Sequence, residues 1–220
     1  MKINIIGTDT EIGKTYVSCA LLNHLQKKGF KVTGIKPIAS GKSNINDLWV
    51  NEDAYNLWQY SNSGLSIEEI NPICFTQAIA PHIAAELEQF NLNTQTVNDK
   101  NQCSINNNVA DVTIIEGVGG LMTPLNHQET YLDLLIQWQY PVILVIGMKL
   151  GCLNHSLLTY NTLISNKINV LGFIVNQINK NMPYQTENLS YLQQKLPAPL
   201  IGYCRYGGEL EITQNFSYVF

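Results

Sequence analysis

Short apolar runs alternate with longer segments of helical length along this chain. Most of these runs are almost continuously apolar, as expected for strands that are covered on both faces. The predicted strands, of which the last has the weakest signal, are Ile3–Ile6, Val32–Ile35, Val112–Ile115, Val142–Ile146, Val170–Val175 and Leu200–Tyr203.

Helical patterns fill the intervals between the runs. The predicted helices are Tyr16–Lys28, Tyr131–Gln139, Leu153–Ser165 and Glu187–Lys195. Strands that alternate with helices predict an α/β fold, a doubly wound and mostly parallel β-sheet flanked by helices. The crossover connections should be right-handed.

Two segments interrupt this alternation. Residues 39–75 predict a polar loop and a short helix at Asp53–Tyr60, which is rich in Trp and Tyr. Residues 91–108 are rich in Asn and Gln and predict a mobile surface connection. No internal repeat or change of composition divides the chain, so we expect one domain over residues 1–220.

The composition narrows the class of protein. Hydrophobic residues make up 45% of the chain, which is enough for a sizeable core, and the net charge is -4. Because the 13 basic residues are scattered, we expect no nucleic-acid partner. The longest apolar stretch, Val142–Met148, is far shorter than a membrane span. Five cysteines without a C-x-x-C pair fit reduced thiols, and we expect a cytoplasmic protein with no membrane partner.

The strongest local signal is the segment Gly7-Thr-Asp-Thr-Glu-Ile-Gly-Lys-Thr15, between the first strand and the first long helix. Backbone N–H groups of such a loop, with the positive end of the helix, form a cradle for phosphate oxygens. Lys14 would contact the β- and γ-phosphates, and the Thr15 hydroxyl would bind Mg²⁺.

This segment departs from the usual G-x-x-x-x-G-K-[ST] pattern, because its first glycine is Gly7 and position 8 is Thr8. The loop is therefore one residue longer than usual. A strand–turn–helix with an incidental Gly-Lys-Thr is the alternative. The position directly after the leading strand favours nucleotide binding.

A second candidate site follows the strand at Val112–Ile115, where Glu116 precedes a glycine-rich turn. A carboxylate at the carboxyl end of a neighbouring parallel strand lies beside the phosphate loop, where Mg²⁺ needs an oxygen ligand. Alone, such a glutamate is usually a solvated loop residue. Asp53, in the first turn of a predicted helix, is by itself explained by the helix dipole.

Several segments together resemble the dethiobiotin synthetases of the biotin pathway, in the family's order and as far as about residue 202. Beside the phosphate loop they are Lys36-Pro-Ile-Ala-Ser-Gly41, Glu116-Gly-Val-Gly-Gly120, Met122-Thr-Pro-Leu125, Pro141-Val-Ile-Leu-Val145, Lys149-Leu-Gly-Cys-Leu-Asn-His155, Asn176 and Leu196-Pro-Ala-Pro-Leu-Ile-Gly202. Partition ATPases and corrinoid amidotransferases share the P-loop NTPase fold but lack this set.

The resemblance implies the chemistry. The family takes 7,8-diaminononanoate, CO₂ and ATP with Mg²⁺. One amine captures CO₂ as a carbamate, which receives the γ-phosphate and becomes a carbamic-phosphoric mixed anhydride. The other amine then closes the ureido ring, releasing phosphate, so that dethiobiotin, ADP and phosphate are formed.

The resemblance also implies roles for particular residues. Lys36 and Lys14 would be catalytic, and Thr15, Asp53 and Glu116 would be the metal ligands. The substrate would contact Thr10, Ser40 and Thr123, and the segment Lys149–His155 would hold its carboxylate tail across a homodimer interface. The nucleotide would contact Glu11, Ile12, Gly13, Lys14, Thr15, Tyr16, Asp53, Glu116, Gly117, Val118, Gly119, Asn176 and Gln177.

Some assignments keep plainer alternatives. A lysine at a strand end, such as Lys36, is normally a solvated surface residue, but Lys36 follows the second strand at the edge of the sheet that carries the phosphate loop. We interpret His155 as a first-turn helix residue and Cys152 as a packing residue. The family commonly has an Ile-Pro-type segment after Gly202, whereas this chain has Tyr203-Cys-Arg-Tyr-Gly-Gly208, which leaves the adenine contacts and the nucleotide preference open.

Three other classes of protein compete with this interpretation. A partition ATPase would carry a second lysine early in the phosphate loop, where this chain has Thr8-Asp9-Thr10. An amidotransferase synthetase domain needs an attached glutaminase, for which we expect no room in 220 residues. A regulatory protein without catalysis would not need to retain Lys36, Asp53 and Glu116 together.

Overall fold

The computed structural model describes residues 1–106, 108–214 and 216. Its main sheet has seven strands in the order β11-β10-β9-β8-β1-β7-β2. All neighbours in this sheet are parallel except β10 and β11, which are antiparallel. The strands are β1 (Lys2–Gly7), β2 (Val32–Ile35), β7 (Val112–Gly120), β8 (Val142–Gly147), β9 (Val170–Asn176), β10 (Leu200–Cys204) and β11 (Leu210–Ile212). The predicted α/β fold and all of its predicted strands are confirmed.

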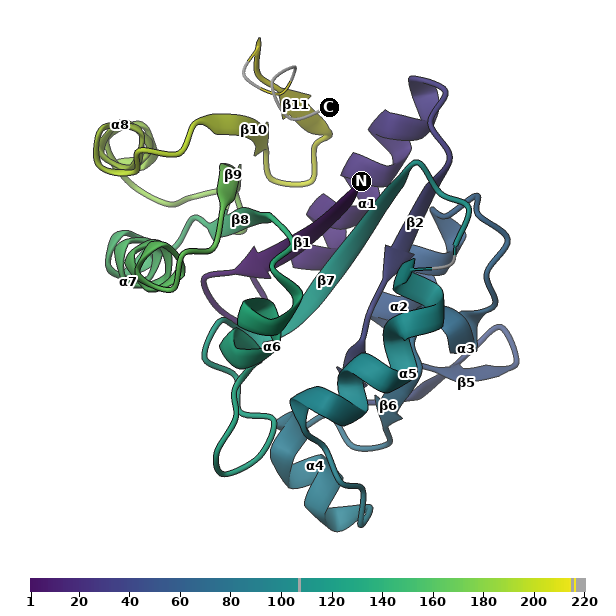
Figure 1. Cartoon of the computed structure of the whole chain (residues 1–220). Coiled ribbons are helices and arrows are strands. Elements are labelled where there is room, and N and C mark those ends of the chain that lie inside the picture. Colours follow the sequence, from purple (N-terminus) through teal and green to yellow (C-terminus); the bar gives the residue numbers. More distant parts are fainter. Residues whose placement is uncertain (107, 215, 217–220) are drawn as a thin grey trace.

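Helices cover both faces of this sheet. In Figure 1, α1 lies behind the sheet, and α5 and α6 lie in front of it. The helices are α1 (Lys14–Lys27), α2 (Glu52–Gln59), α3 (Ile67–Ile70), α4 (Pro81–Leu87), α5 (Thr94–Asn106), α6 (Tyr131–Trp138), α7 (Cys152–Ser165) and α8 (Gln185–Lys195). None of the helices described here combines the length and apolarity that a membrane crossing requires.

The central strand β8 shows why its sequence is apolar at every position. Ile143 and Val145 belong to the core on the α1 side, together with residues of α1 itself. Leu144 and Ile146 face the opposite side, where they pack with residues of α7 and α8. Both faces of the strand are therefore buried, as the continuous apolar run predicts.

Residues 39–75 are more ordered than the predicted polar loop. Strands β3 (Ile38–Ser40) and β6 (Ile73–Phe75) form a small parallel sheet. Strands β4 (Ser43–Ile45) and β5 (Leu48–Val50) form a hairpin. The hairpin turns at Asn46 and Asp47, both of which have positive φ, as a tight two-residue turn requires. The predicted short helix is confirmed as α2.

The prediction of a mobile connection over residues 91–108 is wrong, because most of this segment is helix α5 (residue 107 lies outside the described residues). Val97 and Ile105 are buried on one face of the helix. The buried Asn101 side chain donates a hydrogen bond from Nδ2 to the carbonyl oxygen of Val97 at 2.8 Å. Packing of these few positions outweighs the weak helix propensity of an Asn-rich sequence.

The topology brings the carboxyl ends of the parallel strands to one edge of the sheet. The phosphate-loop segment follows β1, and β1 pairs with β7 on one side and β8 on the other. Lys36 follows the edge strand β2, which pairs with β7. In folds of this kind, ligands bind in the crevice beyond these strand ends.

We expect Ile105→Ala to lower the free energy of unfolding by about 2–5 kcal/mol, the usual cost of removing a buried Ile side chain. Gln102→Ala, an exposed change on the same helix, should alter it by less than about 0.5 kcal/mol. Urea denaturation of the two variants measures the difference. Equal stability of the two variants would contradict the packing of α5.

Candidate functional site

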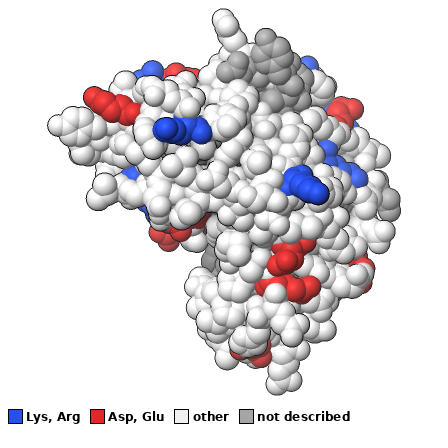
Figure 2. Space-filling model, turned by 60° about the vertical axis from the view of Figure 1, so that its left-hand side comes forward, with Lys and Arg blue, Asp and Glu red and all other residues white. Residues whose placement is uncertain are grey.

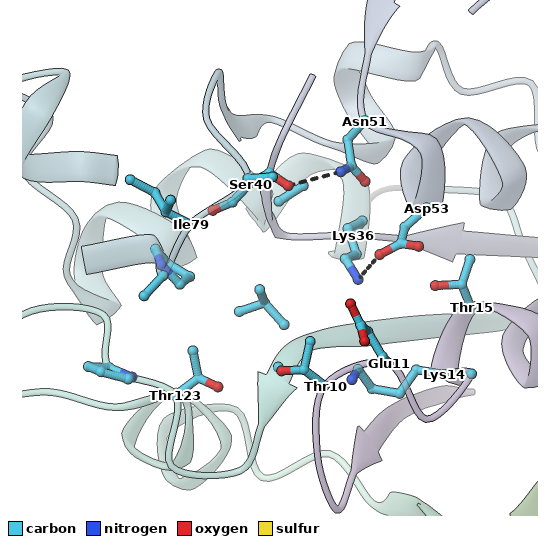
Figure 3. A pocket seen from close by; sticks show the side chains of 18 residues that line it. Thr10, Glu11, Lys14, Thr15, Lys36, Ser40, Asn51, Asp53, Ile79 and Thr123 are labelled. Atoms are coloured by element: carbon cyan, nitrogen blue, oxygen red, sulfur yellow. Dashed lines mark hydrogen bonds and ion pairs between the residues drawn. The ribbon is translucent and has the colours of Figure 1, made fainter. Parts of the chain in front are cut away.

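A cavity of about 780 Å³ lies beside the carboxyl ends of β1, β2 and β7. Figure 3 shows the phosphate loop on one side of it and Ser40, Asn51 and Asp53 on the other. The predicted site residues that line this cavity are Thr10, Glu11, Gly13, Lys14, Thr15, Lys36, Ser40, Asp53, Val118, Gly119 and Thr123. Residues far apart in the sequence thus line the same cavity.

The phosphate loop turns sharply from β1 into α1. Gly13 precedes the helix with a φ of 82°, a left-handed conformation that glycine adopts without strain. Lys14 is buried, and its Nζ donates a hydrogen bond to the carbonyl oxygen of Asp9 at 2.9 Å. The Thr15 hydroxyl donates to Oε1 of Glu116 at 2.7 Å.

Burial of Lys14, together with the nearby charge of Lys36, lowers the pKa of Lys14 to about 8. Both effects disfavour the ammonium form. The carboxylates of Glu116, Asp53 and Asp9 oppose this shift only in part. A phosphate anion placed beside Lys14 would favour its charged form.

Lys36 lies between two carboxylates. Its Nζ is 2.9 Å from Oδ2 of Asp53 and 2.6 Å from Oε1 of Glu116. It also donates to the carbonyl oxygen of Gly117 at 3.3 Å. The side chains of Lys36 and Glu116 are 4% and 0% exposed, whereas that of Asp53 is 45% exposed at the cavity wall. Lys36 is therefore a buried cation within an acidic cluster, and not a solvated surface lysine.

The charges in this cluster support one another. Burial alone would lower the pKa of Lys36, but Glu116 and Asp53 overcome that effect and raise it above its ordinary value. Burial would raise the pKa of Asp53, but the ammonium of Lys36 outweighs burial and lowers it. At neutral pH the lysine is charged and Asp53 is ionised.

The same cluster offers oxygen atoms that suit a hard divalent cation. Oε2 of Glu116 is buried and has no hydrogen-bond partner in the described part of the chain. The Thr15 hydroxyl bonds the other carboxylate oxygen of Glu116, and the Asp53 carboxylate shares Lys36 with Glu116. Mg²⁺ prefers such oxygen ligands. Among the described residues, no group of three or more His, Cys, Asp and Glu side chains could hold a metal ion. Two carboxylates and a hydroxyl are oxygen donors, which is the ligand type that suits Mg²⁺.

Six predicted nucleotide contacts do not line the cavity, and four of them lie around the phosphate loop and its outer end. Ile12 is fully buried beneath the loop, and Tyr16 is 44% exposed, with its hydroxyl bonded to the Gly208 carbonyl. Asn176, at the end of β9, donates from Nδ2 to the Ile12 carbonyl at 2.9 Å. Gln177 accepts a hydrogen bond from the backbone N–H of Tyr206 at 3.2 Å.

Gly117 and Glu116, also predicted contacts, lie under the cavity, where they hold Lys36. The neighbouring Gly119 lines the cavity with a φ of 61°. A Cβ atom at this position would lie 2.3 Å from Oγ1 of Thr123. Only glycine allows this turn and the close approach of Thr123 together.

Sequence reasoning missed several residues of the site. Asn51 caps α2 by accepting the N–H of Ala54 at 3.2 Å, and its Nδ2 donates to the Gly41 carbonyl at 2.9 Å. Asn71 donates to the backbone carbonyl of Lys36 at 2.7 Å. An asparagine directly before Glu-Asp is a helix-start signal that could have revealed Asn51. No local signal marks Asn71.

The cavity has an apolar wall that the sequence analysis also missed. It is formed by the turn at residues 78–81, with Ala39 and Pro124. Gly41 and Ala78 approach so closely that a Cβ at Gly41 would lie 2.8 Å from that of Ala78. This contact fixes the turn against the strand that carries Ser40, so the cavity has a polar half and an apolar half.

The surface shows no basic stripe on the face seen in Figure 2. There the Lys and Arg side chains are separated by uncharged surface, and acidic side chains lie among them. Nucleic-acid binding proteins need a continuous basic patch. The charges on this face are therefore mixed, in a chain whose net charge is -4.

Comparisons with known proteins agree with this site. A family model described as an AAA domain matches residues 1–211. Curated proteins named ATP-dependent dethiobiotin synthetase BioD match over most of their length. The protein from Legionella pneumophila (strain Paris) is 41% identical, covering 94% of each chain. Those from Aromatoleum aromaticum and Wigglesworthia glossinidia brevipalpis are 40% and 37% identical, covering 90% and 97% of this chain and 87% and 92% of theirs.

Comparison with solved structures supports the assignment of the fold. The cell division protein FtsY of Thermotoga maritima superposes with a TM-score of 0.54 at 14% identity, covering all of this chain and 67% of that one. At this identity the likeness shows the P-loop NTPase fold alone. The motifs, the shared cavity and the curated relatives together show that the chain belongs to the dethiobiotin synthetase family.

Proposed function

We propose that this protein is an ATP-dependent dethiobiotin synthetase, which joins 7,8-diaminononanoate and CO₂ into a cyclic urea. The observation that supports this proposal most is the single cavity, which is lined by Lys14, Thr15, Lys36, Asp53, Ser40 and Thr123 together. A triphosphate and a second anionic reactant need such a shared cationic space. The curated relatives carry the same activity in their names.

The proposed reaction has three steps. A substrate amine adds to CO₂ and loses a proton, giving a carbamate. A carbamate oxygen attacks the γ-phosphorus, and the bond to the ADP oxygen breaks. The second amine attacks the carbonyl carbon of the mixed anhydride, phosphate leaves, and the amine loses a proton as the ring closes.

Two lysines address the main obstacle, which is repulsion between the carbamate and the triphosphate. Lys14 contacts the phosphates from the loop, and Lys36 contacts the transferred phosphoryl group from the opposite wall. Both lie on the same cavity, so their charges act on the developing transition state rather than on bulk solvent. The remaining contribution is positioning of the two reactants in line.

Thr15, Asp53 and Glu116 are the proposed ligands of Mg²⁺. The support is the buried Oε2 of Glu116, which has no partner among the described residues, and the two oxygen donors beside it. Bound there, the ion would neutralise charge on the β- and γ-phosphates. The protein side chains fix its place because Lys36 and Thr15 already orient Glu116.

The other predicted contacts divide between the two reactants. Thr10, Ser40 and Thr123 line the cavity and are proposed to bind the diamine. Glu11, Gly13, Val118 and Gly119 line it on the nucleotide side, and the backbones of Ile12 and Gly117 lie close to the same loop. Tyr16, Asn176 and Gln177 surround the outer end of the loop, where the base is proposed to lie.

The chain is also proposed to act in the cytoplasm as a single domain. All five cysteines are free thiols, which suits a reducing compartment. The main sheet includes both the first strand, β1, and the last strand, β11, and the family model spans residues 1–211. Cell fractionation tests the location, and a single cooperative melting transition tests the domain assignment.

The first prediction concerns the reaction itself. With Mg-ATP and bicarbonate, ADP release should depend on added 7,8-diaminononanoate, and chelation of Mg²⁺ should abolish it. A coupled assay follows ADP, and mass spectrometry identifies dethiobiotin. Equal hydrolysis with and without the diamine would instead favour a nucleotide switch.

The second prediction concerns Lys36. Lys36→Gln should lower kcat by about 10²-fold or more, because it removes a cation aimed at developing charge, whereas ATP binding should change little. Lys31→Gln, an exposed lysine before β2, is the matched control and should behave as the parent. Because Lys36→Gln leaves Glu116 unpaired, its melting temperature must be measured as well. A folded variant with parental turnover would show that Lys36 is misassigned.

The third prediction concerns a homodimer, with residues 149–155 at the interface. Leu150 and Leu158 are 98% and 60% exposed, and Met122, which lines a second cavity with Leu158, is 58% exposed. Such exposed apolar side chains favour contact with another subunit. Sedimentation velocity should show a dimer for the parent and a monomer for Leu158→Glu, whereas Leu87→Glu, an equally exposed site on α4, should remain dimeric. A monomeric parent protein would refute the dimer.

A further inference from the structure

The carboxylate of Asp9 joins the phosphate loop to the segment after β8. Its Oδ2 lies 2.5 Å from Nζ of Lys149, and its Oδ1 accepts the backbone N–H of Thr10 at 2.8 Å. Nδ1 of His155 lies 3.8 Å from the same Oδ2. Neither Asp9 nor Lys149 lines the large cavity, although Thr10 does. This ion pair therefore lies outside the large cavity, next to the phosphate loop.

The backbone of Asp9 makes a second connection, toward the cavity. Its carbonyl oxygen accepts the hydrogen bond from Nζ of Lys14 at 2.9 Å. One residue thus holds Lys149 with its side chain and Lys14 with its main chain. Any rotation of the peptide at Asp9 would move the acceptor of Lys14 and the side chain of Thr10 together.

Within the described part of the chain, few other hydrogen bonds hold this part of the loop. The N–H of Thr8 donates to the Val145 carbonyl at 3.1 Å, which fixes the entry into the loop. At the far end, Asn176 holds the Ile12 carbonyl at 2.9 Å. Between these two points, the Asp9 carboxylate provides the hydrogen bonds that fix the turn at residues 9 and 10.

We propose that Asp9 is a positioning residue, and that its ion pair with Lys149 fixes the loop conformation in which Lys14 faces the nucleotide phosphates and Thr10 lines the cavity. The inference rests on the proposed nucleotide binding, but it does not depend on the identity of the acceptor substrate. It predicts that Lys149 affects phosphate affinity although it lies outside the phosphate cavity.

The exposure of the pair makes this role separable from a structural one. The side chains of Lys149 and Asp9 are 37% and 38% exposed. Ion pairs of this kind contribute little to folding stability, because solvent screens them. Loss of the pair should therefore leave the fold intact and change the affinity for phosphates, whereas loss of a contact with no positioning role would leave that affinity unchanged.

The test uses the full chain, with ADP and Mg²⁺ as the probe in isothermal titration calorimetry. Asp9→Asn and Lys149→Met should each weaken ADP binding by about tenfold, an energy of about 1.4 kcal/mol. The double variant should be no weaker than either single variant, because both changes break the same contact. Lys149→Arg, which keeps the charge, should retain most of the affinity.

The matched control is Glu86→Gln, which alters another exposed side-chain contact of a carboxylate, the one between Oε1 of Glu86 and Nε2 of His127 at 3.0 Å. It should bind ADP as the parent does, and all variants should melt within a few degrees of the parent.

Parental affinity in both Asp9→Asn and Lys149→Met would overturn the proposal, and so would losses that multiply in the double variant. A clear drop in melting temperature in both single variants would assign the pair a structural role and also overturn it. If the parent chain does not bind ADP, the proposed function fails, and this inference fails with it.

Discussion

The burial of Glu116 beneath the cavity is the constraint on which the rest of the site depends. A carboxylate with no solvent exposure is strongly disfavoured unless a cation and hydrogen bonds compensate it. Lys36 supplies the cation at 2.6 Å, and Thr15 supplies a hydrogen bond at 2.7 Å. The middle of β7 is thereby connected to the residue after β2 and to the first turn of α1. Compensation of the buried Glu116 charge thus brings β7, the residue after β2 and α1 together.

That cluster also sets the character of the cavity. Asp53, from the start of α2, completes the set of charges around Lys36 while part of its side chain faces the cavity. The result is a wall in which acidic oxygens and ammonium groups alternate within a few ångströms. Such a wall suits a metal ion and two anions, as the proposed phosphoryl transfer to a carbamate would require.

The phosphate loop depends on close approaches that side chains would forbid. A Cβ at Gly13 would lie 2.1 Å from Nδ2 of Asn176, and a Cβ at Gly147 would lie 2.6 Å from Cβ of Ile12. The ends of β8 and β9 therefore pack directly against the loop. Asn176 holds the loop backbone as well as lying at the outer end proposed for the base. These glycines matter because their missing side chains allow close packing. The spacing of glycines in the sequence does not reveal which neighbours they pack against.

The sequence alone determined the elements and their chemistry. Continuous apolar runs predicted the parallel strands, because strands buried on both faces have no polar positions. The segment Gly7–Thr15 after the first strand predicted the phosphate loop, and Glu116 at the end of a neighbouring strand predicted its acidic partner. These inferences needed only local pattern and the rule that parallel strands end at one edge. The same local reasoning failed at α5, where burial of Val97 and Ile105 outweighs an Asn-rich composition.

Only the tertiary structure decided which side chains meet. Lys36 and Glu116 are 80 residues apart, and Asp9 and Lys149 are 140 residues apart. No periodicity records such contacts, because they depend on the register of neighbouring strands and on the path of the loops between them. For the same reason the apolar wall at residues 78–81 and the support of Lys36 by Asn71 were not predictable. Local patterns specify what a residue can do, whereas long-range packing decides which partner it meets.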